Sequence, residues 1–142
     1  MRVLVTGKPN QGSWKIRAEQ LGGAISAKVI PDARIEDIRK SDVVIVVKNF
    51  TTGLLDRIRS LKKPIVWDCV DFWPQPLGNA WDRDKCLQFL RKKLSDVSPQ
   101  MAIAATKQMA DDMRECRLPI KIDYLKHHAR PDQKNNEIRE QI

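Results

Sequence analysis

Two carboxylates and a large aromatic side chain come together at the end of an apolar segment, residues 65–70. Asp68 lies within this segment, and Asp71 and Trp73 follow it closely. A carboxylate can accept a proton from a hydroxyl group as a general base, and a raised pKa helps it to do so. Because side chains alternate along a strand, the two carboxylates share a site only if the chain turns near Cys69. We predict a site role for at least one of them; the alternative is that Asp68 pairs with a nearby basic residue and Asp71 caps a turn.

The loop between the first apolar segment and the first helical pattern is rich in glycine. Gly7 and Gly12 allow a ligand to approach the backbone, and a helix capped by Ser13 would offer unpaired N–H groups to an anion. The spacing matches neither the dinucleotide fingerprint nor the Walker A motif. The loop therefore predicts either an anion cradle or a plain strand-to-helix turn. Arg17, one turn further on, either adds charge to a bound phosphate or is solvated.

Polar and aromatic residues follow the other predicted strands in the same way. Lys48 comes after the Val/Ile segment 42–47 and is either a phosphate contact or a surface lysine. Trp73 is suited to stacking on a sugar ring or a base, although a core position is the common alternative. His127 and His128 follow the last predicted strand and offer a base or hydrogen-bond donors, but adjacent side chains point apart, so at most one faces a given site.

No metal site is predicted. Asp82 and Asp84 match a D-x-D metal pattern, but they fall in the first turn of a predicted helix, where acidic residues complement the dipole. The three cysteines (Cys69, Cys86 and Cys116) form no C-x-x-C pair and are expected to be buried thiols. We expect no cofactor.

Strand and helix patterns alternate along the chain, which is typical of βαβ units and a parallel sheet. The predicted strands are 2–6, 25–30, 42–47, 65–70, 101–105 and 120–125, and the predicted helices are 14–21, 34–40, 51–61, 81–95 and one capped by Thr106. Gly22 and Gly23 are expected to end the first helix. The pattern predicts an α/β, three-layer, Rossmann-like domain: a mostly parallel sheet of about six strands with helices on both faces.

Size and charge limit the function further. The chain has 142 residues and a formal charge of +8, which favours phosphate groups, nucleic acid or an anionic membrane surface as partners. The basic residues are dispersed, so no specific nucleic acid is predicted, whereas peripheral contact with an anionic membrane stays open. No apolar run approaches the ~20 residues of a membrane span, and a cytoplasmic protein is expected. We predict one domain over 1–128 and a polar tail over 129–142, either a docking helix or the approach to a second domain.

Five segments in this order resemble the N-terminal, acceptor-side domain of glycosyltransferases of the GT-B type, which have two Rossmann-like domains. The matching segments are 12–17, 44–48, 66–73, 103–106 and 125–128. The resemblance implies that catalysis occurs in a cleft between the two domains, usually without a metal. It implies a nucleotide-sugar donor, an unknown acceptor, and a second α/β domain or partner chain that holds most of the donor. That domain's Glu-rich motif and glycine loop have no counterpart in these 142 residues.

The resemblance also implies roles for residues. The loop 7–13 would face the donor phosphates, Asp68 or Asp71 would lie near the acceptor, and His127 and His128 would approach the crossover to the second domain. The expected function is thus part of a sugar-transfer enzyme, inactive alone; the alternative is a non-catalytic α/β module that binds a phosphate, a nucleotide, a protein or nucleic acid. The catalytic candidates are Asp68, Asp71 and His128, and the binding candidates are Gly7, Gly12, Ser13, Arg17, Lys48, Trp73 and His127.

Overall fold

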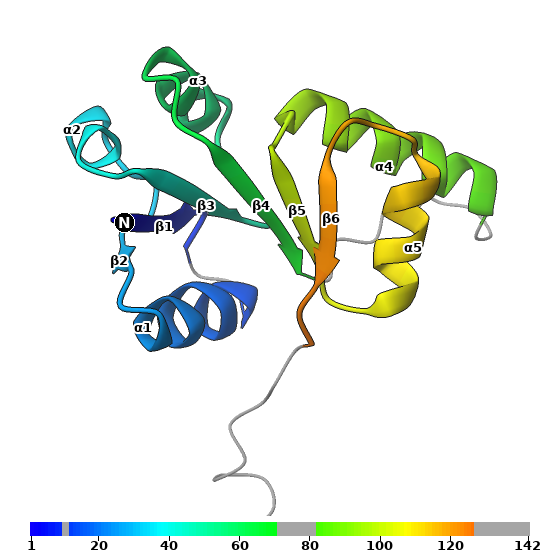
Figure 1. Ribbon diagram of the computed structural model, residues 1–142, viewed down its shortest axis with the longest axis horizontal. Helices are drawn as coiled ribbons and strands as arrows, with labels where there is room; N and C mark the ends of the chain where they lie inside the picture. Colours follow the sequence, from blue (N-terminus) through cyan, green and yellow to red (C-terminus); the bar gives the residue numbers. More distant parts are fainter. Residues whose placement is uncertain (10–11, 71–81, 127–142) are drawn as a thin grey trace, which may run out of the picture.

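A six-stranded, all-parallel sheet forms the centre of the molecule (Figure 1). The computed structural model describes residues 1–9, 12–70 and 82–126. The strands are β1 (Val3–Gly7), β2 (Lys28–Val29), β3 (Val43–Val47), β4 (Ile65–Val70), β5 (Met101–Ala104) and β6 (Lys121–Tyr124), in the order β2-β1-β3-β4-β5-β6. The predicted α/β, Rossmann-like fold is confirmed.

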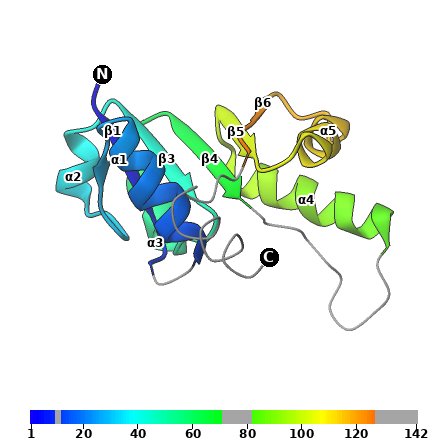
Figure 2. The same cartoon turned by 90° about the horizontal axis from the view of Figure 1, so that it is seen from below.

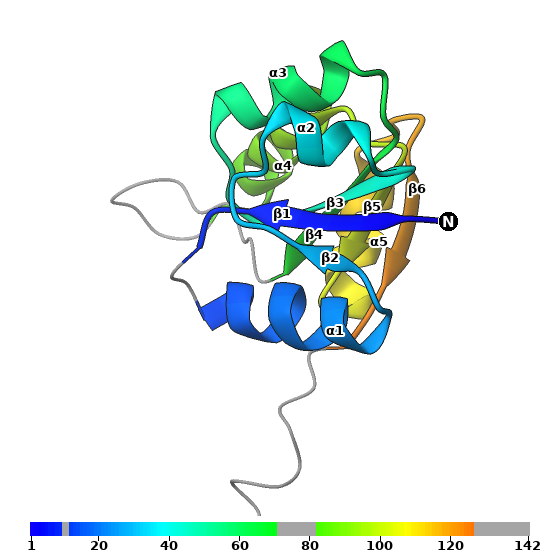
Figure 3. The same ribbon diagram turned by 90° about the vertical axis from the view of Figure 1, so that its left-hand side faces the viewer.

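Helices cover both faces of the sheet, which gives three layers (Figures 1 and 3). They are a π-helical segment η1 (Trp14–Leu21) that continues into α1 (Gly22–Ala24), then α2 (Ile35–Arg39), α3 (Thr52–Ser60), α4 (Arg83–Val97) and α5 (Lys107–Glu115). Across the sheet, the chain moves from β1 to its neighbour β2 on one side, and from β2 through β3, β4, β5 and β6 it moves toward the other side. Right-handed crossovers therefore place η1 and α1 on one face and the other helices on the opposite face.

Two apolar clusters correspond to these two faces. The larger one joins β3, β4 and β5 to α3, α4 and α5, with Trp67 and Leu94 among its fully buried side chains. The smaller one contains Trp14 and Ala18 of η1, which pack on Val47 and Val70 of the strands. Figure 2 shows the helix η1–α1 lying over β1 and β3 rather than over β5 and β6.

Part of the sheet face beside η1 carries apolar side chains that belong to neither cluster. Val66 is paired with Met101, and Ile103 with Asp68, so all four side chains share this face. Val66, Met101 and Ile103 are half-buried and pack into neither of the two described cores. Because parallel sheets are normally covered on both faces, we expect an element other than the described helices to cover them.

The first helix differs from its prediction at both ends. Ser13 is not an N-cap: its backbone is helical, with φ −60° and ψ −34°, and its side chain makes no capping bond. Gly22 and Gly23 do not end the helix, which continues to Ala24. A Cβ atom on Gly22 would lie 2.7 Å from Cγ2 of Val29. The glycine thus serves the close packing of helix on strand, and the longer helix leaves β2 only two residues.

The remaining boundaries lie within a few residues of the predictions, and the predicted caps are confirmed. Thr51 accepts a hydrogen bond from the N–H of Leu54, and Thr106 from the N–H of Met109. These bonds satisfy donors that the first helical turn leaves unpaired. Within the described ranges, no helix has the length and apolar character needed to cross a bilayer.

Candidate functional site

All six strands end at the same edge of the sheet because they are parallel. The strand order reverses between β1 and β3, and ligands of open α/β sheets bind where such a reversal separates the loops. We call the region between the loops after β1 and β3, where the strand order leads us to expect a crevice, the switch-point crevice. Gly7, Lys8, Gly12, Ser13 and Lys48 belong to these two loops and to the start of the first helix.

Backbone hydrogen bonds hold the two loops together. The N–H of Lys8 donates to the carbonyl of Asn49 at 2.7 Å, which joins the two loops, and the N–H of Lys48 donates to the carbonyl of Asp68 at 2.7 Å, which joins the second loop to β4. Gly7 has φ +154°, and a Cβ atom there would lie 2.7 Å from the carbonyl oxygen of Val47. Only glycine permits this approach of β1 to β3. This requirement for glycine comes from strand packing, and the role of Gly7 in ligand binding stays a prediction.

The first helix begins at the same edge of the sheet, and Gly12 is already helical, while the two residues before it lie outside the described ranges. Ser13 makes no capping bond. The first N–H groups of a helix have no partner within the helix and can bind an acceptor such as an anion. The helix dipole adds positive potential at the same end. Lys8 is exposed, and Lys48 is half-buried with a left-handed backbone, φ 46°. The arrangement favours an anionic ligand.

Arg17 and Asp68 do not face the crevice: they form a buried ion pair with each other. Arg17 is 3% exposed and Asp68 is 1% exposed, and the distance from Nε to Oδ2 is 3.6 Å. Arg17 Nη2 also donates to the carbonyl of Leu125, just beyond β6. Arg17 Nε has no hydrogen-bond acceptor among the described residues. The guanidinium therefore joins η1 to the ends of β4 and β6, and is not exposed as a phosphate contact.

Asp68 supports a change of direction at the end of β4. Its Oδ1 accepts a hydrogen bond from the N–H of Val70 at 3.1 Å, and the strand register shifts between these two residues. Val70 has φ 54°, which is strained for a β-branched residue. Burial raises the pKa of the Asp68 carboxyl, and the charge of Arg17 and the Val70 hydrogen bond oppose that shift. The backbone thus departs from the extended conformation at Val70, and the expected turn that would bring Asp71 to the same site lies outside the described residues.

Four of the predicted site residues lie outside the described residues: Asp71, Trp73, His127 and His128. Their roles stay predictions. Asp71 directly follows the strained Val70, and His127 comes two residues after Leu125, whose carbonyl Arg17 holds. The described part of the chain thus fixes the backbone immediately before each of these segments.

A polar network beside the crevice was not predicted. Asp32 accepts hydrogen bonds from Thr51 and Arg57, at 3.0 and 2.8 Å. The buried hydroxyl of Thr6 accepts a hydrogen bond from the N–H of Ala33 at 2.9 Å. These contacts fix the loop after β2 against β1 and α3. The only sequence signal for them is the position of Thr6 and Asp32 near strand ends.

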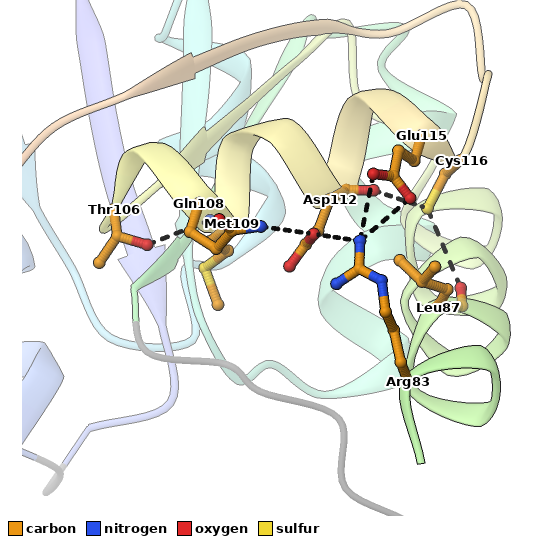
Figure 4. Close-up of polar contacts among 8 residues, drawn as sticks. All are labelled: Arg83, Leu87, Thr106, Gln108, Met109, Asp112, Glu115 and Cys116. Atoms are coloured by element: carbon orange, nitrogen blue, oxygen red, sulfur yellow. Dashed lines mark hydrogen bonds and ion pairs between the residues drawn. The ribbon is translucent and has the colours of Figure 1, made fainter. Parts of the chain in front are cut away.

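In the D-x-D segment, Asp82 and the intervening Arg83 contact other groups of the protein. Asp82 caps α4 by accepting a hydrogen bond from the N–H of Lys85 at 2.9 Å. Arg83 Nη2 lies 2.9 Å from Oδ1 of the buried Asp112 and 3.1 Å from the carboxylate of Glu115, which ties α4 to α5 (Figure 4). Over the described ranges, no group of three or more His, Cys, Asp or Glu side chains is placed to hold a metal ion.

The comparisons with known proteins add no relative. No family model, no curated protein and no solved structure matches this chain. The functional argument therefore rests on the fold, on the switch-point crevice and on the buried Arg17–Asp68 pair beside it.

Proposed function

We propose that this chain is the acceptor-side α/β domain of a sugar-transfer enzyme of the GT-B type, with a nucleotide-activated sugar as donor. The observation that carries the proposal is the switch-point crevice: a backbone hydrogen bond joins the loops after β1 and β3, these loops carry Lys8 and Lys48, and the first helix begins at the same edge of the sheet. Backbone N–H groups and lysines at such a point offset the charge of a phosphate. The donor of sugar transfer carries a diphosphate.

The proposed chemistry assigns one task to each group. The acceptor hydroxyl loses its proton to Asp71 and attacks the anomeric carbon, the bond from that carbon to the diphosphate breaks, and the nucleoside diphosphate leaves. Lys8, Lys48 and the helix N-terminus stabilise the negative charge on the leaving group. His128 donates a hydrogen bond to the reacting groups. Asp68 acts as a positioning residue, because it holds the N–H of Val70 next to Asp71.

The proposal includes a second α/β domain or partner chain that supplies most contacts to the donor. The half-buried side chains of Val66, Met101 and Ile103 support it, since they pack into neither described core. Because parallel sheets are normally covered on both faces, we propose that the second domain or partner chain contributes to the cover of this face.

A non-catalytic module that binds a phosphate or a nucleotide is the second candidate. Asp68 favours it, because the one predicted catalytic carboxylate within the described residues is buried and paired with Arg17. A binding module needs the crevice but no general base.

Equilibrium unfolding in the presence of ligands tests the proposal. Nucleotide-sugars at a hundred times their Kd should add about 2.7 kcal/mol to the free energy of unfolding. Lys8→Ala and Lys48→Ala should weaken this effect, whereas Lys40→Ala and Lys121→Ala, which are exposed and distant from the crevice, should not. The absence of any stabilisation by nucleotide-sugars, free nucleotides and pyrophosphate would refute both candidates.

Transfer assays then separate the two candidates. They use the chain together with the second α/β domain or partner chain that the proposal includes. Asp71→Asn and His128→Asn should abolish release of nucleoside diphosphate while leaving nucleotide-sugar binding intact. Binding without release in the unaltered protein, with every acceptor tried, would favour the non-catalytic module.

A further inference from the structure

A second concave site lies on the side of η1 that faces β2. It has a volume of about 460 Å³, within the ~300–1,000 Å³ that small-molecule sites occupy. Its lining residues are Pro9, Trp14, Lys15, Glu19, Val29 and Pro31. We call it the Trp14 hollow. Pro9 belongs to the loop after β1, and none of these side chains takes part in the Arg17–Asp68 pair.

The apolar part of the hollow is fixed in place. Trp14 and Val29 belong to the smaller apolar cluster and pack on the sheet. Pro9 and Pro31 follow β1 and β2, and their rings restrict the backbone. Two prolines, a valine and the accessible part of an indole offer flat apolar contacts with few hydrogen-bonding groups.

Hydrogen bonds hold the loop that contains Pro31. The N–H of Asp32 donates to the carbonyl of Gly7 at 2.9 Å, and the N–H of Ala33 donates to the Thr6 hydroxyl at 2.9 Å. The spacing between the two proline-bearing loops is therefore set before any ligand arrives. A preformed site of this kind loses little entropy when it binds.

The polar part of the hollow consists of two opposite charges. Lys15 and Glu19 are exposed, four residues apart on η1, and neither has a partner among the described residues. Together they offer a hydrogen-bond donor and an acceptor to the polar edge of a ligand.

We propose that the Trp14 hollow binds a planar aromatic ring with a polar edge and, resting on the proposed function, that this ring belongs to the acceptor. A flat ring presents donors and acceptors only at its edge, which suits a lining with two prolines and two charged side chains. A pyranose ring fits less well, because sugars stack on a broad exposed aromatic face and Trp14 is 5% exposed.

NMR titration of the chain tests the ring preference. 4-Nitrophenol and uridine are the planar probes, and cyclohexanol and glucose are the non-planar controls. 4-Nitrophenol should shift the signals of Trp14 and Val29 saturably, and cyclohexanol and glucose should bind about tenfold more weakly or worse. No saturable binding, or equal binding of cyclohexanol, overturns the proposal. Tighter binding of uridine than of 4-nitrophenol overturns the assignment to the acceptor.

Chemical blocking tests the location. Pro31→Cys places a thiol at the hollow for reaction with N-phenylmaleimide, and Pro119→Cys, in the exposed loop before β6, is the matched control. The native thiols of Cys69, Cys86 and Cys116 are at most 4% exposed and should not react in the folded protein. Labelled Pro31→Cys should bind 4-nitrophenol about tenfold more weakly, and labelled Pro119→Cys should bind as before. Unchanged binding after labelling at position 31 overturns the proposal.

The polar edge has its own variants, and circular dichroism checks that each folds. Lys15→Gln and Glu19→Gln should each weaken ring binding several-fold, while Glu36→Gln on α2 should not. Ring binding without nucleotide-sugar binding would support the Trp14 hollow as a binding site and would refute the proposed function. Nucleotide-sugar transfer without ring binding would support the proposed function and would refute the proposal for the Trp14 hollow.

Discussion

Removal of the Arg17 guanidinium should destabilise the fold by several kcal/mol at neutral pH. Arg17 and Asp68 are almost fully buried, and the distance from Nε to Oδ2 is 3.6 Å. With an effective dielectric constant of about 20, Coulomb's law gives an attraction of about 4–5 kcal/mol at that distance. Arg17→Met would leave the carboxylate of Asp68 buried without its counter-charge. We expect a loss of about 3–5 kcal/mol in the free energy of unfolding.

The pH dependence of this loss follows from the pKa of Asp68. Burial already raises that pKa, and Arg17 opposes the shift, so the pKa should rise further in Arg17→Met. A carboxyl group whose pKa is higher in the folded state than in the unfolded state lowers stability above the folded pKa. This penalty disappears as the pH falls toward the unfolded value of about 3.9. The difference between Arg17→Met and the unaltered protein should therefore shrink between pH 7 and pH 4.

Urea unfolding at both pH values measures the effect. Asp68→Asn keeps an acceptor for the N–H of Val70 but leaves the guanidinium buried and unpaired, so it should also destabilise. The double variant should lose clearly less than the sum of the two single losses, because neither charge is then left alone. Lys92→Met is the control. It removes an exposed pair with Asp96, whose side chains are 71% and 56% exposed, and should cost at most about 0.5 kcal/mol.

Two results would refute this reasoning. A loss below about 1 kcal/mol in Arg17→Met would mean that the pair contributes no more than an exposed one. An equal loss at pH 4 and pH 7 would mean that the cost comes from packing and not from an uncompensated charge.

The other predictions concern packing, capping and a surface pair. Gly22→Ala should destabilise the fold, because its Cβ would lie 2.7 Å from the side chain of Val29 on β2. Gly23→Ala should stabilise the fold by about 0.5–1 kcal/mol, because nothing lies within 4 Å of its Cβ. Thermal unfolding of both variants checks this. Thr106→Ala should cost about 1 kcal/mol in urea unfolding through loss of the α5 cap, and Lys107→Ala close to nothing. The hydrogen bond from Arg2 lowers the pKa of Asp42 from 3.8 to about 2. The contribution of Asp42 to stability should therefore be complete above pH 3.8 and be lost as the pH falls through about 2. A carboxyl NMR titration measures this pKa, and Asp42→Asn should remove this part of the acid sensitivity of the fold.

Local patterns were sufficient for most elements of the fold. The apolar segment that became β3 and the threonines that cap α3 and α5 were predictable, because strand burial and helix capping depend on residues a few positions apart. The alternation of strands and helices likewise implied a parallel sheet, since right-handed crossovers leave few other arrangements. The length of the first helix was not predictable, because the need for glycine at position 22 comes from β2 and not from the helix itself.

The sequence by itself determined which residue types gather at the ends of the strands: glycines after β1, a lysine after β3, and carboxylates at and after β4. Only the tertiary structure decided their uses. Arg17 and Asp68 are far apart in the chain, and no local sequence pattern indicates that they form an ion pair between η1 and β4. The physical reason is desolvation. Because both side chains are buried, each charge needs the other as a counter-charge, and neither is available to a ligand.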